Sequence, residues 1–184
     1  MTFIIIIVAI AAFAIFYLVG IYNKFVRKRS MMEEGWSGID VQLKKRHDLI
    51  PNLVETVKGY AKHEQETLNQ VIEARNSALK AEGVKAQTAA ENQLNSALAN
   101  VFALSEAYPD LKANTNFLQL QQDLAAVEND VEKARRYYNA TVRDNNIMVE
   151  SFPSNMIANA FGFNLGEYFE IENISERSAP QIKF

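Results

Sequence analysis

The run from Phe3 to Tyr22, FIIIIVAIAAFAIFYLVGIY, constrains this chain more than any other feature. It contains no charged residue, and twenty residues at about 1.5 Å each form a helix of about 30 Å, which is the thickness of the hydrocarbon core of a bilayer. The run therefore predicts a transmembrane anchor over residues 1–23. A cleaved signal peptide is the alternative, but such a peptide carries basic residues before an apolar core of only about 7–15 residues.

A basic segment, residues 24–30, follows the anchor. It contains Lys24, Arg27, Lys28 and Arg29, whereas the residues before the apolar run include no Lys or Arg. Because positive charge is retained on the cytoplasmic side, we expect a single-pass protein of the bacterial inner membrane with a short N-terminus outside and its body in the cytoplasm. The four cations are also placed to meet anionic headgroups, at about 1 kcal/mol each.

The rest of the chain is acidic. Beyond the basic segment, 15 Lys and Arg stand against 22 Asp and Glu, so nucleic acid is not an expected partner, since phosphate binding requires a basic face. The chain has no cysteine, which excludes disulfides, zinc–thiolate sites and thiol nucleophiles.

Apolar residues after the basic segment recur at helical spacing. Steps of three and four residues connect Trp36 to Ala78, and a second register runs from Phe117 to Phe152. The sequence predicts an all-α fold in which residues 31–163 form an antiparallel up-and-down bundle. We expect helices over about 31–81, 88–108, 115–152 and 154–161, the second capped by Thr88 and Glu91, and the last capped by Ser154 and stopped at Gly162. An irregular tail, residues 164–184, completes the chain.

Pro51 lies inside the first of these helices. Proline removes the hydrogen bond to the carbonyl four residues earlier, at a cost of roughly 3 kcal/mol or a kink. Two geometries remain open: one long helix kinked at Pro51, or a turn at HDLIP with Asp48 capping a new helix, which would make four shorter helices in all. The uninterrupted apolar register across Pro51 favours the kink.

The two histidines suggest metal or acid–base chemistry, but their surroundings do not support it. The zinc-protease motif H-E-x-x-H would begin at His63 and fails because residue 67 is Thr67. The Glu-x-x-His pairs of di-iron bundles fail because Lys44 and Tyr60 precede His47 and His63 by three residues. No phosphate-binding glycine loop or nucleophile elbow is present. We therefore expect no enzyme activity, no catalytic or metal-binding residues and no cofactor.

Polar residues on the apolar stripes are the remaining candidate sites. They are Arg46 and Glu64 in the first helix, and Arg135, Tyr138 and Asn139 in the segment ARRYYN. A buried unpaired charge is costly, so pairing within the chain is the simpler interpretation. The sharper hypothesis is that these residues set the register between copies in a coiled-coil oligomer.

The segment NMIANAFGF contains Met156, Ile157, Phe161 and Phe163 at helical spacing and could lie on a membrane surface. It contains no Lys or Arg, which favours closure of the bundle end over lipid contact.

The blocks IDVQLKKRHDLIPNLVETVKGYAKHE and ARRYYN, with the closing PQIKF, resemble the LemA family of bacterial membrane proteins. The resemblance implies a helical cytoplasmic bundle behind one membrane span, with no agreed enzymatic activity. It also implies links to envelope stress, to a neighbouring membrane zinc protease and to internal membrane organelles. Where relatives commonly have Tyr-Asn, this chain has Asn145-Asn146, which puts an aromatic contact at Asn145 in doubt.

Together these observations predict a non-enzymatic, membrane-anchored scaffold or adaptor that forms homo-oligomers. A membrane-shaping or lipid-organising protein is the alternative, and a hydrolase or metalloenzyme is a distant third. The expected partners are the lipid bilayer, further copies of the chain, and a membrane protease or another envelope protein.

Overall fold

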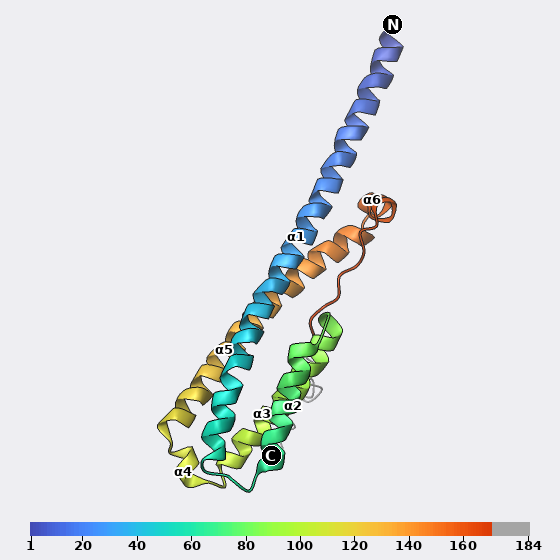
Figure 1. Ribbon diagram of the computed structural model, residues 1–184. Coiled ribbons are helices and arrows are strands. Elements are labelled where there is room, and N and C mark those ends of the chain that lie inside the picture. Colours follow the sequence, from blue (N-terminus) through green and yellow to red (C-terminus); the bar gives the residue numbers. More distant parts are fainter. Residues whose placement is uncertain (171–184) are drawn as a thin grey trace, which may run out of the picture. The chain divides into compact units, whose positions relative to one another are not determined.

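The computed structural model describes residues 1–170, and within this range all regular secondary structure is helical. This confirms the all-α prediction. Figure 1 shows the helices, which are α1 (Thr2–Lys58), α2 (Gln65–Lys80), α3 (Val84–Ser105), α4 (Pro109–Lys112), α5 (Thr115–Glu150) and α6 (Ser154–Phe161). They form two compact units. The anchor unit consists of Met1–Val41 and Glu132–Tyr168, and the bundle unit consists of Gln42–Val131 together with Phe169.

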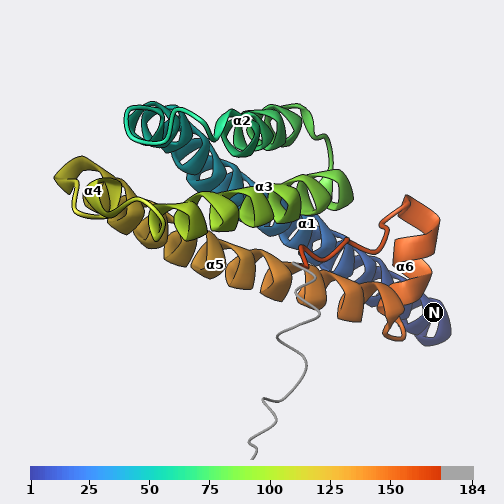
Figure 2. The ribbon, with the colours of Figure 1, turned by 90° about the horizontal axis from the view of Figure 1, so that it is seen from below.

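The anchor unit pairs the first part of α1 with the second part of α5 in antiparallel fashion. Lys28 of α1 contacts Asp144 of α5, and further along α1 the ring of Trp36 meets that of Tyr138, earlier in α5. Helix α6 packs against both, and Figure 2 shows it beside the N-terminal part of α1. The local core of this end combines residues from α1 and α6: Ile21, Phe25, Ile157 and Ala158.

The bundle unit is built around one hydrophobic core from α1, α2, α3, α4 and the start of α5. Its buried side chains recur at steps of three and four residues, so the predicted apolar stripes lie inside. They include Ile50, Leu53, Val57, Leu68, Val71, Leu94, Leu98, Val101, Leu111, Phe117 and Leu124. The loop between α2 and α3, residues 81–83, is short, and these two helices lie side by side (Figures 1 and 2).

Residues 2–20 are helical, and each of the first twenty residues is exposed. Within the described residues, α1 is the one helix long and apolar enough to cross a membrane, with a mean hydropathy of 3.0 over its most apolar 18-residue window. A core helix of a soluble protein would bury such a stretch, whereas only 6% of this window is buried. The run is therefore a candidate for a single membrane anchor.

Helix α1 passes through Pro51 without interruption and ends at Lys58. The favoured helix through Pro51 is therefore confirmed, and the alternative, a turn at HDLIP, is wrong; a single helix reaching residue 81 is wrong as well. Pro51 is tolerated because its ring is exposed and because the carbonyl of His47, which loses its helical donor, accepts a hydrogen bond from Arg75 Nε at 2.7 Å.

The break falls instead at residues 59–64, after Gly59, a residue that costs about 1 kcal/mol in a helix relative to alanine. Here the N–H groups of Tyr60 and Ala61 both bond to the carbonyl of Val57. Because Val57 and Leu68 on either side of the break, and Ala61 within it, are all buried, the apolar register continues across the break and conceals it.

Two predicted helix starts also differ. Thr88 lies inside α3, where its hydroxyl donates to the carbonyl of Val84, and Gly83 occupies the N-cap position with φ of 82°. Ser154 is the first residue of α6, and its hydroxyl donates to the carbonyl of Met148, at the end of α5. The stop of α6 at Gly162, with φ of 71°, is confirmed. Residues 164–170 have no regular secondary structure, and the rest of the predicted tail, including PQIKF, lies outside the described residues.

Candidate functional site

The bundle unit contains a buried polar cluster centred on Glu91 of α3, whose side chain is 1% exposed. One carboxylate oxygen, Oε2, accepts a hydrogen bond from Arg46 Nη1 at 3.1 Å. The other, Oε1, lies 2.8 Å from His47 Nε2 and accepts a hydrogen bond from Gln87 Nε2 at 3.0 Å. We call these four residues, with Asn95, the Glu91 cluster. The contacts among these five residues join helices α1 and α3 or lie within α3, and Gln87 Nε2 also donates to the carbonyl of Ala78 in α2 at 3.3 Å.

Arg46 is matched on both sides of its guanidinium. While Nη1 faces Glu91, Nη2 donates to Asn95 Oδ1 and forms an ion pair with Glu128 Oε2 at 3.1 Å. Two carboxylates therefore surround one buried arginine, which compensates for the removal of its charge from water. For Arg46 the simpler interpretation, pairing within the chain, is confirmed, whereas a role in register between copies stays a prediction.

The Glu91 cluster has the groups of an acid–base site but not the access. His47 is only 3% exposed, so a substrate could not reach its ring without opening the bundle. His63 is exposed and lies in the 59–64 connection, and the structure does not bring the two histidines together at one site. The arrangement is suited to fixing α1 against α3.

Sequence reasoning missed Glu91, because Thr88 and Glu91 have the spacing of a capping box. The available signal was its position, three residues before Leu94 and seven before Leu98, both of which are buried. An acidic side chain at a core position requires a partner of opposite charge. Arg46, on the apolar stripe of the first predicted helix, was a cation to which the sequence assigned no partner.

Glu64 and its neighbours hold the bend between α1 and α2 against the bend between α3 and α5. Glu64 Oε1 accepts a hydrogen bond from the Tyr108 hydroxyl at 3.2 Å, and the Tyr60 hydroxyl accepts one from Asn114 Nδ2 at 2.8 Å. Partial burial, followed by the hydrogen bond and charge of Glu64, raises the pKa of Tyr108 above its usual 10.0. Like Arg46, Glu64 has a partner within its own chain.

The segment ARRYYN lies in the anchor unit. Tyr138 is buried and donates its hydroxyl to the carbonyl of Glu167 at 2.9 Å. Burial, and then the charge of Glu167, raises the pKa of Tyr138 above 10.0. Arg135 and Asn139 are both half-buried, and nothing in the structure distinguishes a register role for them.

The Asn145–Asn146 pair of α5 holds the segment that follows α6 through hydrogen bonds to its backbone. Asn145 Nδ2 donates to the carbonyl of Asn164 at 3.1 Å, and Asn146 exchanges two hydrogen bonds with the backbone of Gly166, at 2.7 and 3.0 Å. The side-chain amide of Asn145 therefore bonds to the backbone at the position where the resemblance had suggested an aromatic contact.

The four predicted membrane-surface cations divide into two groups. Lys28 forms an ion pair with Asp144 at 2.8 Å, and this hydrogen bond and charge lower the pKa of Asp144 below its usual 3.8. Lys24, Arg27 and Arg29 are exposed, and the Arg29 guanidinium lies 6.0 Å from the centre of the Phe163 ring. Lys24 and Arg27 are thus available to a headgroup. Arg29 Nε also lies 3.9 Å from Glu33 Oε1 in an exposed ion pair, and Lys28 stabilises the packing of α1 against α5.

The segment NMIANAFGF closes one end of the anchor unit and also presents an apolar face. Phe163 stacks on Phe25 at 4.6 Å between ring centres, and Phe161 meets Tyr22 edge to face at 5.0 Å. Ile157 is buried, but Met156 and Phe161 are 63% and 62% exposed. Closure of the bundle end, as predicted, explains the buried face of this segment, but it does not explain the exposed apolar face.

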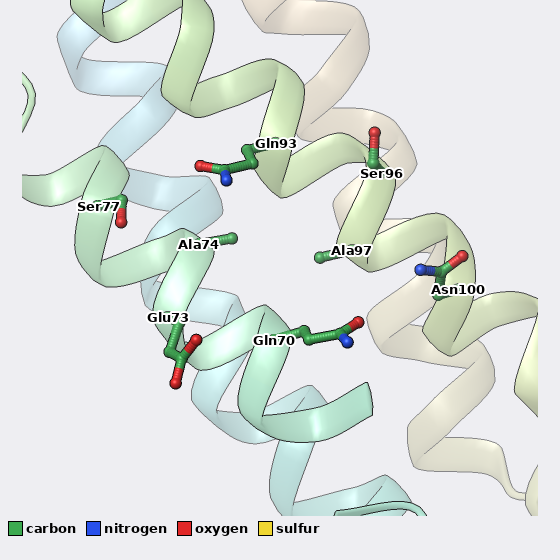
Figure 3. Close-up of a pocket in the computed structure, with 8 residues that line it drawn as sticks. All are labelled: Gln70, Glu73, Ala74, Ser77, Gln93, Ser96, Ala97 and Asn100. Carbon is green, nitrogen blue, oxygen red and sulfur yellow. The ribbon is translucent and has the colours of Figure 1, made fainter. Parts of the chain in front are cut away.

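A groove of about 310 Å³ runs between α2 and α3 in the bundle unit. Figure 3 shows Ala74 and Ala97 pointing toward one another across it, with polar side chains around them. Apart from the carboxylate of Glu73, the polar lining is amide and hydroxyl: Gln70, Ser77, Gln93, Ser96 and Asn100. A nucleophile with an adjacent base is missing from this lining, so it suggests no reaction. Among residues 1–170, no group of three or more potential His, Asp or Glu ligands is arranged to hold a metal ion.

The family model described as LemA family matches residues 35–184. Magnetosome proteins MamQ 1 and MamQ 2 of Paramagnetospirillum magneticum are each 24% identical over 175 residues, covering 81% of this chain and 64% of their own length. Protein LemA of Metamycoplasma hominis is 26% identical over 152 residues, covering 81% of this chain and 69% of its own. The chain thus spans less than two thirds of the length of the magnetosome proteins that it matches.

Proposed function

We propose that this chain, which belongs to the LemA family, is a non-enzymatic scaffold or adaptor anchored in the bacterial inner membrane. The observation that carries the proposal is the N-terminal end of α1, where nineteen of the twenty residues of the apolar run are exposed, all but Ile21, on a helix that continues into the folded body. In water, such a surface would aggregate, whereas in a bilayer it is in its preferred environment. The exposed cations that follow it favour a cytoplasmic body.

The way in which the polar residues pair supports a role as a scaffold rather than as an enzyme. The buried charges of the bundle unit pair with one another, and the open groove between α2 and α3 has no acid–base pair. A stiff, well-packed bundle of this kind is suited to presenting its surface to another protein. We propose a membrane protease or another envelope protein as the partner.

Cysteine labelling tests the anchor and its orientation, since the natural chain has no cysteine. Single variants Thr2→Cys and Ser96→Cys would be treated in intact cells with a membrane-impermeant maleimide. We expect residue 2 to be labelled at once and residue 96, exposed on α3, to react only after the membrane is permeabilised. Labelling of residue 96 in intact cells would reverse the proposed topology, and recovery of the protein in the soluble fraction would refute the anchor.

Self-association is part of the proposal, because an anchor confines all copies to one plane and raises their effective concentration. Light scattering of the detergent-solubilised protein, corrected for bound detergent, should give a mass of more than one chain. A monomer at all concentrations tested would rule out the homo-oligomer and leave a one-chain adaptor.

A membrane-shaping or lipid-organising role is the second candidate, and one observation favours it. The exposed Met156 and Phe161 lie on α6, which packs against α1 at Tyr22, the last residue of the apolar run. Two relatives also carry the name magnetosome protein. Electron microscopy of reconstituted vesicles would test this role: tubules or vesicles smaller than protein-free controls support it, and unchanged vesicles oppose it.

A further inference from the structure

The apolar end of α6 forms one wall of a groove whose other wall is α1. The groove has a volume of about 290 Å³, and its lining is Leu18, Val19 and Tyr22 from α1 with Ile157 and Phe161 from α6. The tyrosine hydroxyl is the one polar side-chain group in this lining. Such a groove is complementary to a hydrocarbon chain and offers almost nothing to a polar ligand.

The depth of the groove in the bilayer follows from the sequence. Leu18, Val19 and Tyr22 belong to the last two turns of the apolar run, so the groove lies where acyl chains give way to headgroups. Aromatic residues are typical of this level, and here the ring centre of Tyr22 lies 5.0 Å from that of Phe161 and 5.6 Å from that of Phe163.

Charge at the same end of the molecule favours a phospholipid. Helix α6 has no cation of its own, which argued against lipid contact when the sequence was considered alone. In the anchor unit, however, α1 supplies one. Arg29 lies on the same face of α1 as Leu18 and Tyr22, about two turns beyond Tyr22, and its guanidinium lies 6.0 Å from the Phe163 ring centre.

We infer that the groove between α1 and α6 holds an acyl chain of a phospholipid from the cytoplasmic leaflet, with its phosphate toward Arg29. Helix α6 then lies in the interface as a second membrane contact beside the anchor. This inference rests on the proposed membrane anchoring, and continuity of the groove with the membrane span is what selects lipid as the occupant.

Photocrosslinking of the full-length chain tests the inference. The protein is reconstituted in vesicles of phosphatidylethanolamine and phosphatidylglycerol doped with a phosphatidylglycerol that carries a diazirine in its acyl chain. Mass spectrometry then maps the crosslinks. We expect them on α6 at Ile157 or Phe161 as well as along α1, and more at Leu18 than at Tyr17, which has the same depth but points away from the groove.

The variant Phe161→Ser removes an exposed wall of the groove, and Phe152→Ser is its matched control, because Phe152 is 80% exposed and does not line the groove. We expect Phe161→Ser to lower the crosslinking yield in the groove about threefold to tenfold, as loss of part of one aromatic contact implies. The control should leave the yield unchanged. Unchanged thermal unfolding of both variants would show that the fold is intact.

The outcomes separate this inference from the proposed function. A chain that is extracted by alkaline carbonate and has no crosslinks on α1 would refute the anchor itself. An anchored chain with crosslinks on α1 but none on α6, or with equal yields for Phe161→Ser and wild type, would overturn the groove alone. Crosslinks from residue 161 to a second copy of the chain, in place of lipid, would assign the groove to an oligomer and overturn the inference as well.

Discussion

Glu91 is a charged residue at a position of α3 that faces the core. Its carboxylate is compensated by donors from Arg46, His47 and Gln87, all of which are buried. A buried ion pair is a weak source of stability, because desolvation offsets most of the attraction, but removal of one partner leaves an unpaired charge in the interior. The cluster therefore acts as a constraint on how α1 and α3 pack.

Replacement Glu91→Ala should destabilise the protein by about 3–5 kcal/mol, because Arg46 and its neighbours lose the group that compensates them. Chemical unfolding of the detergent-solubilised chain, followed by circular dichroism, measures this. The matched control is Glu73→Ala on α2, an exposed carboxylate that should change stability by less than about 0.5 kcal/mol. The double replacement Arg46→Met with Glu91→Leu should recover much of the loss. A cost for Glu91→Ala as small as that of the control would contradict the constraint.

Arg75 replaces the hydrogen-bond donor that Pro51 lacks, through its 2.7 Å bond to the carbonyl of His47. Arg75→Met, which keeps the apolar stem, should cost about 1–2 kcal/mol in the natural chain. Pro51→Ala should stabilise α1 by about 1–3 kcal/mol and supply an N–H to the same carbonyl. In that background the Arg75→Met cost should fall by about 1 kcal/mol, as a double-mutant cycle would measure. Equal costs in both backgrounds would mean that Arg75 stabilises by packing alone.

Asp144 should titrate below its usual pKa of 3.8, because Lys28 donates to it and stabilises its charged form. A folded-state pKa below the unfolded value makes this pair stabilising above the unfolded pKa, and that contribution is lost as the pH falls through the folded pKa. Carbon-13 NMR of the Asp144 carboxyl measures the titration. Lys28→Met should return the pKa toward 3.8, whereas Lys24→Met, at an exposed lysine, should not. A similar response to both variants would exclude a specific pair.

At the residue scale, the sequence predicted the kind of interaction but not the partners. Arg46 was expected to pair within the chain, and it does, with a residue 45 positions away. Which carboxylate it meets depends on how α1 packs against α3, and that depends on the break at residues 59–64. The partner could not be read from local spacing.

At the element scale, the long helices were predictable, whereas one of their breaks and the short helix α4 were not. Five stripe positions of α5, at steps of seven from Phe117 to Asn145, are buried, as the register predicted, but the sixth, Phe152, lies beyond the end of α5 and is 80% exposed. The break after Lys58 was missed because proline is the stronger local signal, yet Pro51 is accommodated by a contact from α2. The tertiary structure brings Arg75 to the carbonyl of His47 and so supplies the hydrogen-bond donor that Pro51 lacks. The apolar register continues through Gly59 and therefore did not indicate that the helix ends there.

Gly35 allows α1 and α5 to approach closely in the anchor unit. A Cβ at this position would lie 3.1 Å from the Cα of Tyr138, whereas one at Gly38 would meet nothing within 4 Å. Gly38→Ala should therefore stabilise the helix by about 1 kcal/mol, through helix propensity alone. Gly35→Ala should instead destabilise by about 1–2 kcal/mol, because overpacking exceeds that gain. Thermal unfolding of both variants in detergent measures the difference, and a gain at Gly35 equal to that at Gly38 would show that no close packing is enforced there.

At the scale of the whole chain, the composition distinguishes a part that favours the membrane from a part that favours water. An uncharged run is followed by exposed cations and then by an acidic body, and each part has a different preferred environment. The α6 groove adds a point that composition does not reveal, because its two walls are separated by about 140 residues of sequence. Only the fold brings Tyr22 and Phe161 together, so the groove that we infer to hold lipid could not be predicted from the residues of α6 alone.

The apolar run should stay inserted in the membrane when one charged residue is introduced, but not when two are. Thirteen of its twenty residues are Ile, Val, Leu or Phe, which together favour insertion by about 4–8 kcal/mol at most, whereas a central arginine costs about 2.5–3.5 kcal/mol. Ala12→Arg should therefore remain in the membrane, while Ala11→Arg with Ala12→Arg brings the balance near zero and should release a large fraction of the protein. Resistance to alkaline carbonate extraction measures this, and Ala11→Leu with Ala12→Leu is the matched control. Full retention of the double-arginine variant would mean that the run does not span the bilayer and that other contacts hold the chain at the membrane.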